Sequence, residues 1–164
     1  MPRMKPRRAR ATIMAREVRV SSLALHVSTR ADKPRGGVPT VESGPWLEVT
    51  GEIDKPVREV RTMAVTVLPM VPEEPGASVP PSIGSIIQVR PTLTAVVSVP
   101  VADFDRVWSM AISGHLNYVH VVFTEPDRRS ALIVSVAFSN KSENDEPESP
   151  SPPDAQASPN TEHG

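Results

Sequence analysis

The residues best suited to catalysis lie close together between Ser113 and Asp127. The candidates in this segment are Ser113, His115 and His120, with Asn117 between the two histidines and Glu125 and Asp127 in the turn that follows. A serine, a histidine and a carboxylate can form a nucleophilic triad, because the histidine takes the hydroxyl proton and the acid orients the histidine. Ser113 does not lie in the G-x-S-x-G pattern of a nucleophile elbow, and neighbours in a chain seldom point at each other. We therefore expect Ser113 to end a helix. A hydrolase using Ser113 with His115 or His120 remains a hypothesis, ranked third after the two binding functions described below.

Metal and cofactor sites find little support in the sequence. His115 and His120 have opposite parity along a strand, so their side chains would lie on opposite faces. Asp103 and Asp105 diverge on a helix. The chain has no cysteine, which excludes thiolate metal sites and a cysteine nucleophile. The glycine pair at 36–37 is followed at once by a valine and a proline, which cannot open a phosphate-binding helix. We expect no metal, no cofactor and no enzymatic activity.

Three side chains are candidate contacts for a protein partner: Trp46, Tyr118 and His120. Trp46 is the one large residue on a strand face that is otherwise polar between residues 46 and 52. An exposed tryptophan can anchor a protein interface, and it can equally cap the edge of the core next to Pro45. Tyr118 and His120 share one face of a predicted strand, which is typical of a half-buried imidazole with a hydrogen-bond partner.

The N-terminal segment 1–11 offers a second kind of partner. It carries five basic side chains suited to phosphate contacts: Arg3, Lys5, Arg7, Arg8 and Arg10. Such a segment would bind nucleic acid in a salt-sensitive, sequence-independent way. No aromatic residue lies beside it for base stacking, and residues 36–138 hold seven Lys or Arg against eleven acids. A nucleic-acid-associated protein is therefore the alternative hypothesis; the segment could also only aid solubility or contact the acidic tail.

The two ends of the chain have opposite charge and little to bury. The first 35 residues hold ten Lys or Arg against two acids, whereas residues 139–164 hold one lysine against six acids and five prolines. Segments of this composition cannot offset the entropy lost on ordering. We expect a basic disordered arm at 1–11 and an acidic Pro/Ser-rich disordered tail at 139–164. An alternative start at Met4 would remove part of the arm, and one at Met14 would remove all of it.

Residues 103–113 have the apolar spacing of one short helix. Five side chains fall on a single helical face: Phe104, Val107, Trp108, Ala111 and Ile112. Asp103 is expected to be the N-cap, and Gly114 is expected to end the helix in a left-handed conformation.

The rest of the chain alternates with a period of two, which predicts β-strands. We expect about seven of them, at residues 12–29, 46–53, 57–68, 85–89, 92–101, 118–123 and 132–138. The parity changes at Ser21-Ser22, which indicates a bulge or a crossing between sheets. Residues 54–56 are expected to form a turn, and residues 30–44 and 69–84 to form loops, the second of them a crossover or a functional loop.

These patterns predict a mainly β fold: a single antiparallel β-sandwich-like domain at 12–138 with one short α-helix. The lack of cysteine favours a reducing compartment, and we expect a cytoplasmic protein. No segment approaches the roughly 20 apolar residues that span a bilayer, so no membrane partner is expected. The leading hypothesis is a non-catalytic protein-interaction or accessory module.

Overall fold

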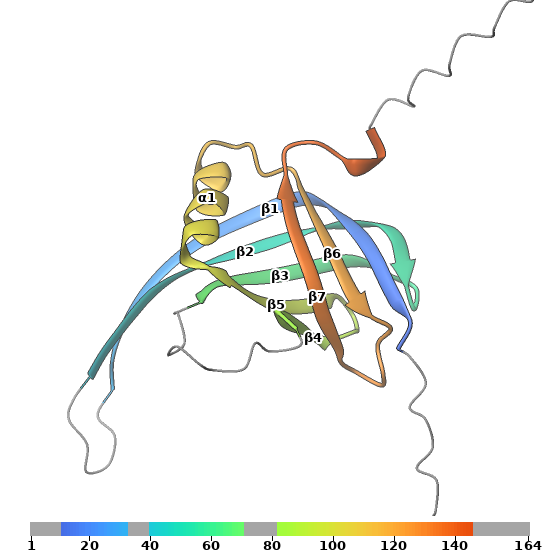
Figure 1. The fold of residues 1–164 in the computed structure, drawn as a ribbon, viewed down its shortest axis with the longest axis horizontal. Helices are drawn as coiled ribbons and strands as arrows, with labels where there is room; N and C mark the ends of the chain where they lie inside the picture. Colours follow the sequence, from blue (N-terminus) through green and yellow to red (C-terminus); the bar gives the residue numbers. More distant parts are fainter. Residues whose placement is uncertain (1–10, 33–39, 71–81, 146–164) are drawn as a thin grey trace, which may run out of the picture.

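The computed structural model describes residues 11–32, 40–70 and 82–145 (Figure 1). Within these residues the elements are β1 Ile13–Asp32, β2 Thr40–Val57, β3 Val60–Met70, β4 Gly84–Gln88, β5 Leu93–Pro100, α1 Val101–Ile112, β6 Tyr118–Thr124, β7 Ala131–Ser139 and the short 3-10 helix η1 Glu143–Asp145. The mainly β fold with seven strands and one helix is confirmed. Almost all of the predicted arm, most of the predicted tail and parts of both predicted loops lie outside the described residues.

The seven strands pair in a closed circle, which we call the ring. Their order is β1-β2-β3-β5-β4-β7-β6, and β6 pairs with β1. All pairs are antiparallel except β3 with β5, so the expectation of a purely antiparallel fold is wrong there. The chain from β3 crosses to β4, and the β4–β5 hairpin then returns β5 to lie beside β3 in the same direction. Most of the connection that the sequence predicted as a crossover or a functional loop, residues 71–81, lies outside the described residues.

The core is formed by one face of each strand together with α1, which packs against β3 and β5. Alternate residues of β2, β3, β5 and β6 are buried, because a strand presents successive side chains to opposite faces. The largest fully buried side chains are Phe104, Phe123, Leu47, Met63, Ile86, Leu93 and Ile133. The predicted inward face of β2, with Leu47, Val49 and Ile53, is confirmed.

The parity change in β1 is a confirmed irregularity of register. The pairing of β1 with β2 shifts between Val20 and Ser22. Val18 before the shift and Leu23 after it both pair with apolar residues of β2, so the shift keeps the apolar face of β1 on one side. Gly51 lies at this point, where a Cβ atom would come within 2.0 Å of the Arg19 carbonyl oxygen. Only glycine fits this close approach.

The helix begins earlier than predicted. Its first residue is Val101 and its N-cap is Pro100, which makes no side-chain cap. Asp103 is therefore not the N-cap; it lies in the first turn and pairs with Arg106 at 3.0 Å. Proline fixes the backbone before the first helical residue, and this moves the boundary. The helix ends as predicted, with Gly114 at a φ of 72°.

The predicted apolar helix face is only partly correct. Phe104, Val107 and Ala111 are buried, and Trp108 is half-buried against Phe104, with ring centroids 5.7 Å apart. Ile112 is 65% exposed, so its assignment to the core is wrong.

The β2–β3 turn lies further along the chain than predicted. Strand β2 continues to Val57, and the turn is Arg58-Glu59, with φ values of 47° and 70°. Val57 and Val60 pair across it and are both buried, which stabilises a two-residue turn at this position. The predicted loop at 30–44 is also shorter, because β1 extends to Asp32 and β2 begins at Thr40.

None of the described helices is long and apolar enough to cross a membrane.

Candidate functional site

The structure brings Ser113 and His115 together. The Nδ1 atom of His115 lies 3.0 Å from Ser113 Oγ, so our expectation that these neighbours would not meet is wrong. They meet because the chain turns sharply at Gly114, directly after the helix. The Ser113 hydroxyl donates to the Ser109 carbonyl at 2.8 Å, and both side chains are exposed. No carboxylate of the described residues hydrogen bonds to His115 to orient its ring.

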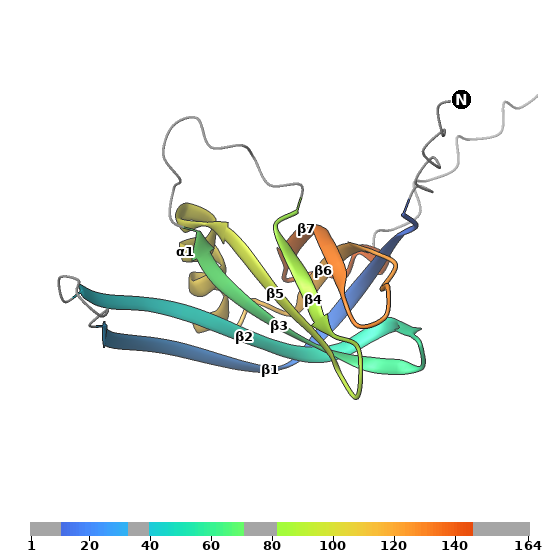
Figure 2. The same cartoon turned by 90° about the horizontal axis from the view of Figure 1, so that it is seen from below.

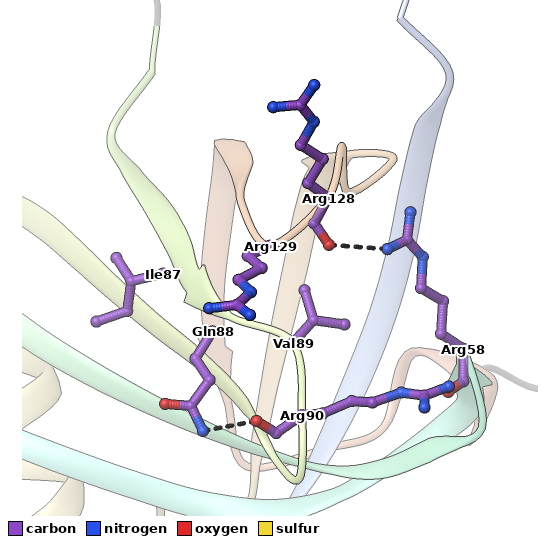
Figure 3. A pocket seen from close by; sticks show the side chains of 7 residues that line it. All are labelled: Arg58, Ile87, Gln88, Val89, Arg90, Arg128 and Arg129. Carbon is purple, nitrogen blue, oxygen red and sulfur yellow. Dashed lines mark hydrogen bonds between the residues drawn. The ribbon is translucent and has the colours of Figure 1, made fainter.

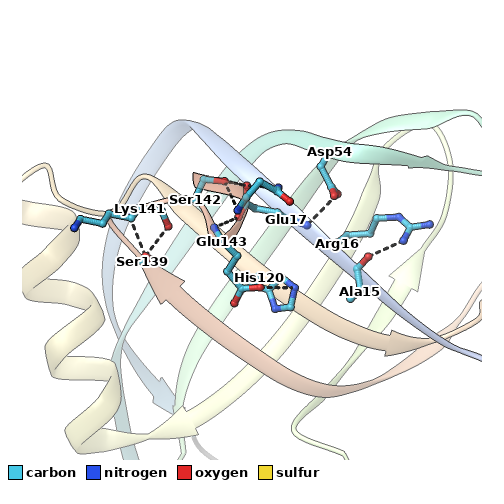
Figure 4. Close-up of polar contacts among 10 residues, drawn as sticks. Ala15, Arg16, Glu17, Asp54, His120, Ser139, Lys141, Ser142 and Glu143 are labelled. Carbon is cyan, nitrogen blue, oxygen red and sulfur yellow. Dashed lines mark hydrogen bonds and ion pairs between the residues drawn. The ribbon is translucent and has the colours of Figure 1, made fainter. Parts of the chain in front are cut away.

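His120 belongs to a different cluster, on the outer face of β6. Its Nε2 atom lies 3.3 Å from Glu143 Oε2 (Figure 4). Glu17, opposite His120 on β1, is 8% exposed. The Glu17 carboxylate accepts hydrogen bonds from Ser142 Oγ at 2.6 Å and from the Glu143 main-chain N–H at 2.8 Å. These contacts fix η1 to the ring, so the described structure continues past the boundary at 138 that the sequence suggested.

The remaining polar candidates are dispersed. Tyr118 is half-buried and lines a hollow of about 260 Å³ together with Glu17 and Arg19. Asp103 lies in the first turn of α1, whereas Asp127 lies in the β6–β7 turn, where its main chain bridges to Ser130. Among the described residues no group of three or more His, Asp or Glu side chains is placed to hold a metal ion.

Trp46 lies on a projection of the sheet. Residues 25–32 of β1 and 40–47 of β2 continue as a pair, which we call the ribbon (Figure 2). Trp46 pairs with His26 across the ribbon, and their rings stack with centroids 4.7 Å apart and planes 8° apart. His26 Nε2 also lies 3.4 Å from Glu48 Oε2. Trp46 is half-buried by this stack and sits at the edge of the folded body.

The other face of the ribbon is apolar and open. Leu25 is 41% exposed and Val27 is 70% exposed. Among the described residues, β6 pairs with β1 only up to Arg19, and no strand lies along the outer edge of β1 between residues 22 and 28. The ribbon therefore presents apolar side chains beside an unpaired strand edge.

A cluster of arginines at one end of the ring was not found by the sequence analysis. Arg58, Arg90, Arg128 and Arg129 line a cleft of about 620 Å³, which we call the arginine cleft (Figure 3). They come from the β2–β3 turn, the β4–β5 connection and the β6–β7 turn. The only sequence feature that could have suggested it is that each of these residues is an arginine in or beside a predicted turn.

The predicted phosphate contacts at Arg3, Lys5, Arg7, Arg8 and Arg10 lie outside the described residues. The described chain begins beside the arginine cleft, where the Glu125 N–H donates to the Thr12 carbonyl at 2.7 Å.

Comparison with known proteins found no match for this chain: no family model, no curated protein and no solved structure matches it.

Proposed function

We propose that this protein is a non-catalytic interaction module that binds a polypeptide strand along the ribbon. The observation that supports this most strongly is the apolar stripe of β1, which continues from the core onto the ribbon and becomes exposed there. Leu23 packs against the core, Leu25 is partly exposed and Val27 is largely exposed. Full burial of one such aliphatic side chain contributes about 1.5–3 kcal/mol.

The backbone of the ribbon favours strand addition as the mode of binding. An unpaired edge offers a row of N–H and C=O groups that a partner strand can satisfy, while its alternate side chains pack on the exposed face. A two-stranded ribbon is at best marginally stable alone in water. On the opposite face of the ribbon, Trp46 of β2 stacks on His26 of β1. This contact holds the two strands together and keeps the apolar face presented to a partner.

The polar clusters support a non-catalytic role. The Ser113 hydroxyl is engaged with a main-chain carbonyl of α1, and the Glu17 carboxylate is engaged with the segment that leads to η1. Both groups therefore have structural partners. A turnover assay with Ser113→Ala tests the hydrolase hypothesis. If Ser113 is the nucleophile, any hydrolysis by the wild-type chain should be lost in this variant.

A matched pair of lysine substitutions tests the proposal. Val27→Lys places a charge on the ribbon, whereas Ile112→Lys places one at a similarly exposed aliphatic residue on α1. Light scattering over a range of concentrations identifies a second copy of the chain as the partner, and nuclease-treated pull-downs identify a different protein. We expect Val27→Lys to abolish the dimer or the captured protein and Ile112→Lys to retain it. Equal binding by both variants would rule out the ribbon.

A further inference from the structure

The outer edge of β1 has a sequence that is nearly symmetric about Leu25. Residues 22–28 read Ser-Leu-Ala-Leu-His-Val-Ser, with a serine at each end and an aliphatic residue two positions to either side of Leu25. When two identical strands pair antiparallel about a two-fold axis, residue i of one faces residue j of the other, and residue j faces residue i. A near-palindrome is therefore the pattern that lets a strand pair with its own copy.

The unpaired backbone groups of this edge belong to its aliphatic residues. The Thr50 carbonyl points to β1, because it accepts a hydrogen bond from a serine hydroxyl of β1 at 3.1 Å. Ser22 is the register partner of Thr50, so Ser22 and every second residue after it bond to β2. Pro45, opposite Val27, fits this alternation because proline has no N–H to donate there. The backbone groups that point to the outer edge are those of Leu23, Leu25 and Val27.

No charged side chain protects this edge. Residues 20–29 contain no Lys, Arg, Asp or Glu, although such side chains commonly block pairing at exposed strand edges. The His26 ring lies on the other face of the ribbon from Leu25, stacked on Trp46. A charged partner strand would gain no ion pair here, whereas a second copy would place no like charges opposite each other. The net charge of −1 per chain also gives two copies little repulsion.

We propose that the strand bound by the ribbon is β1 of a second copy of this chain, paired antiparallel over residues 22–28 and centred on Leu25. This inference rests on the strand-binding function proposed above and names its partner. In this register Leu25 faces the partner's Leu25, and Leu23 faces the partner's Val27. The pairing ends at Ser22, because the Val20 N–H already donates to the Asn117 carbonyl at 2.8 Å, where the chain enters β6. The two ribbons then form one four-stranded sheet with a continuous apolar stripe.

The size of this contact sets its expected strength. Figure 2 shows the ribbon projecting from the ring with β1 as its outer strand, so a second copy can reach the edge. The paired segment is about 24 Å long and contributes far fewer residues than the roughly 20–30 per side of a standard stable interface. We therefore expect a dimer that dissociates on dilution, with a Kd of about 10 µM or weaker.

Disulfide trapping in the full chain tests the register, because the chain has no cysteine of its own. Leu25→Cys places two thiols opposite each other, at a Cα separation of about 5.5 Å that a disulfide can bridge. Val27→Cys is the matched control. Val27 is 70% exposed against 41% for Leu25, yet the register separates the two copies of Val27 by roughly 14 Å along the strands. With diamide as the oxidant, we expect Leu25→Cys to form a linked dimer at least about tenfold faster than Val27→Cys or Ile112→Cys.

Sedimentation velocity of the wild-type chain tests the association itself. We expect the mean mass to rise from monomer toward dimer between about 5 and 500 µM. Val27→Lys should remain monomeric over this range, and Ile112→Lys should behave as the wild type. Either of two results would overturn the second copy as the partner: a wild-type chain that stays monomeric throughout, or a Val27→Cys dimer that forms as fast as the Leu25→Cys dimer.

Failure of this inference is distinguishable from failure of the proposed function. If the wild-type chain is monomeric but captures a different protein that Val27→Lys loses, the ribbon still binds a strand and only the identity of the partner is wrong. If Val27→Lys and Ile112→Lys behave alike in both sedimentation and capture, the ribbon is not the binding surface and both proposals fail.

Discussion

The guanidinium of Arg58 in the β2–β3 turn donates a hydrogen bond to the main-chain carbonyl of Arg128 in the β6–β7 turn, 2.9 Å away. The two turns do not belong to neighbouring strands, because β5 and β4 lie between β3 and β7 in the ring. This side chain therefore connects two hairpins across one end of the ring.

Arg58→Met should lower the free energy of unfolding by about 1–3 kcal/mol. The substitution keeps most of the aliphatic stem and removes two charge-assisted hydrogen bonds, leaving the Pro126 and Arg128 carbonyls without these donors. Arg61→Met is the control, because Arg61 is exposed and lies on β3 near the same end. Urea denaturation measures both. A loss no greater than that of the control would mean that the connection contributes nothing to stability.

Glu59→Gly should stabilise the protein by about 0.5–1 kcal/mol. Glu59 has a φ of 70°, a conformation that costs most residues roughly 1–2 kcal/mol and costs glycine nothing, although glycine loses more entropy on folding. The same substitution at Glu52, within β2, should instead destabilise by about 0.5–1 kcal/mol. Thermal unfolding of the two variants gives shifts of opposite sign if the turn is correctly placed.

Phe104→Ala should lower the free energy of unfolding by about 3–5 kcal/mol, because the Phe104 side chain on the inner face of α1 is fully buried in the core. Trp108→Ala should cost less, since half-burial leaves part of its ring in water before the substitution. Ile112→Ala, on the exposed side of the helix, should change stability by no more than about 0.5 kcal/mol. Chemical denaturation ranks the three, and any other order contradicts the observed orientation of α1.

Glu17→Ala should release η1 from the ring. The main-chain N–H of Glu143 donates directly to the Glu17 carboxylate, so its hydrogen exchange reports on this contact. We expect faster exchange at Glu143 and Asn144 and a loss of about 1.5–3 kcal/mol in unfolding free energy. Glu52→Ala, which removes an exposed carboxylate from β2, should leave that exchange unchanged. Unchanged exchange in Glu17→Ala would contradict the anchoring role.

Local sequence patterns were sufficient for most of the secondary structure. Alternation in β2, β3, β5 and β6 identified their buried faces, and the parity change at Ser21-Ser22 located the irregularity in β1. The β2–β3 turn was misplaced because residues 54–56 contain typical turn formers, whereas Arg58 and Glu59 are unusual in left-handed positions. Turn propensity is highest at residues 54–56, and it contains no information about the pairing of Val57 with Val60 that places the turn at Arg58-Glu59.

The candidate sites depended on contacts that no local pattern contains. The arginine cleft requires three turns to meet at one end of the ring, which follows from strand order. The Glu17 contacts join residues more than 120 positions apart in the chain. Sequence reasoning proposed Trp46 as a contact from its place on a polar face, and it had no means of pairing Trp46 with His26.

The pairing of β1 with β6 has a consequence for how the protein is made. Residues 13–19 pair with residues 118–124, so β1 is synthesised roughly a hundred residues before its neighbour β6. Until then the β1–β2–β3 sheet has an open edge along the whole of β1. Synthesis therefore exposes a long unpaired strand edge, and such an edge can pair with another chain and aggregate until β6 has been made.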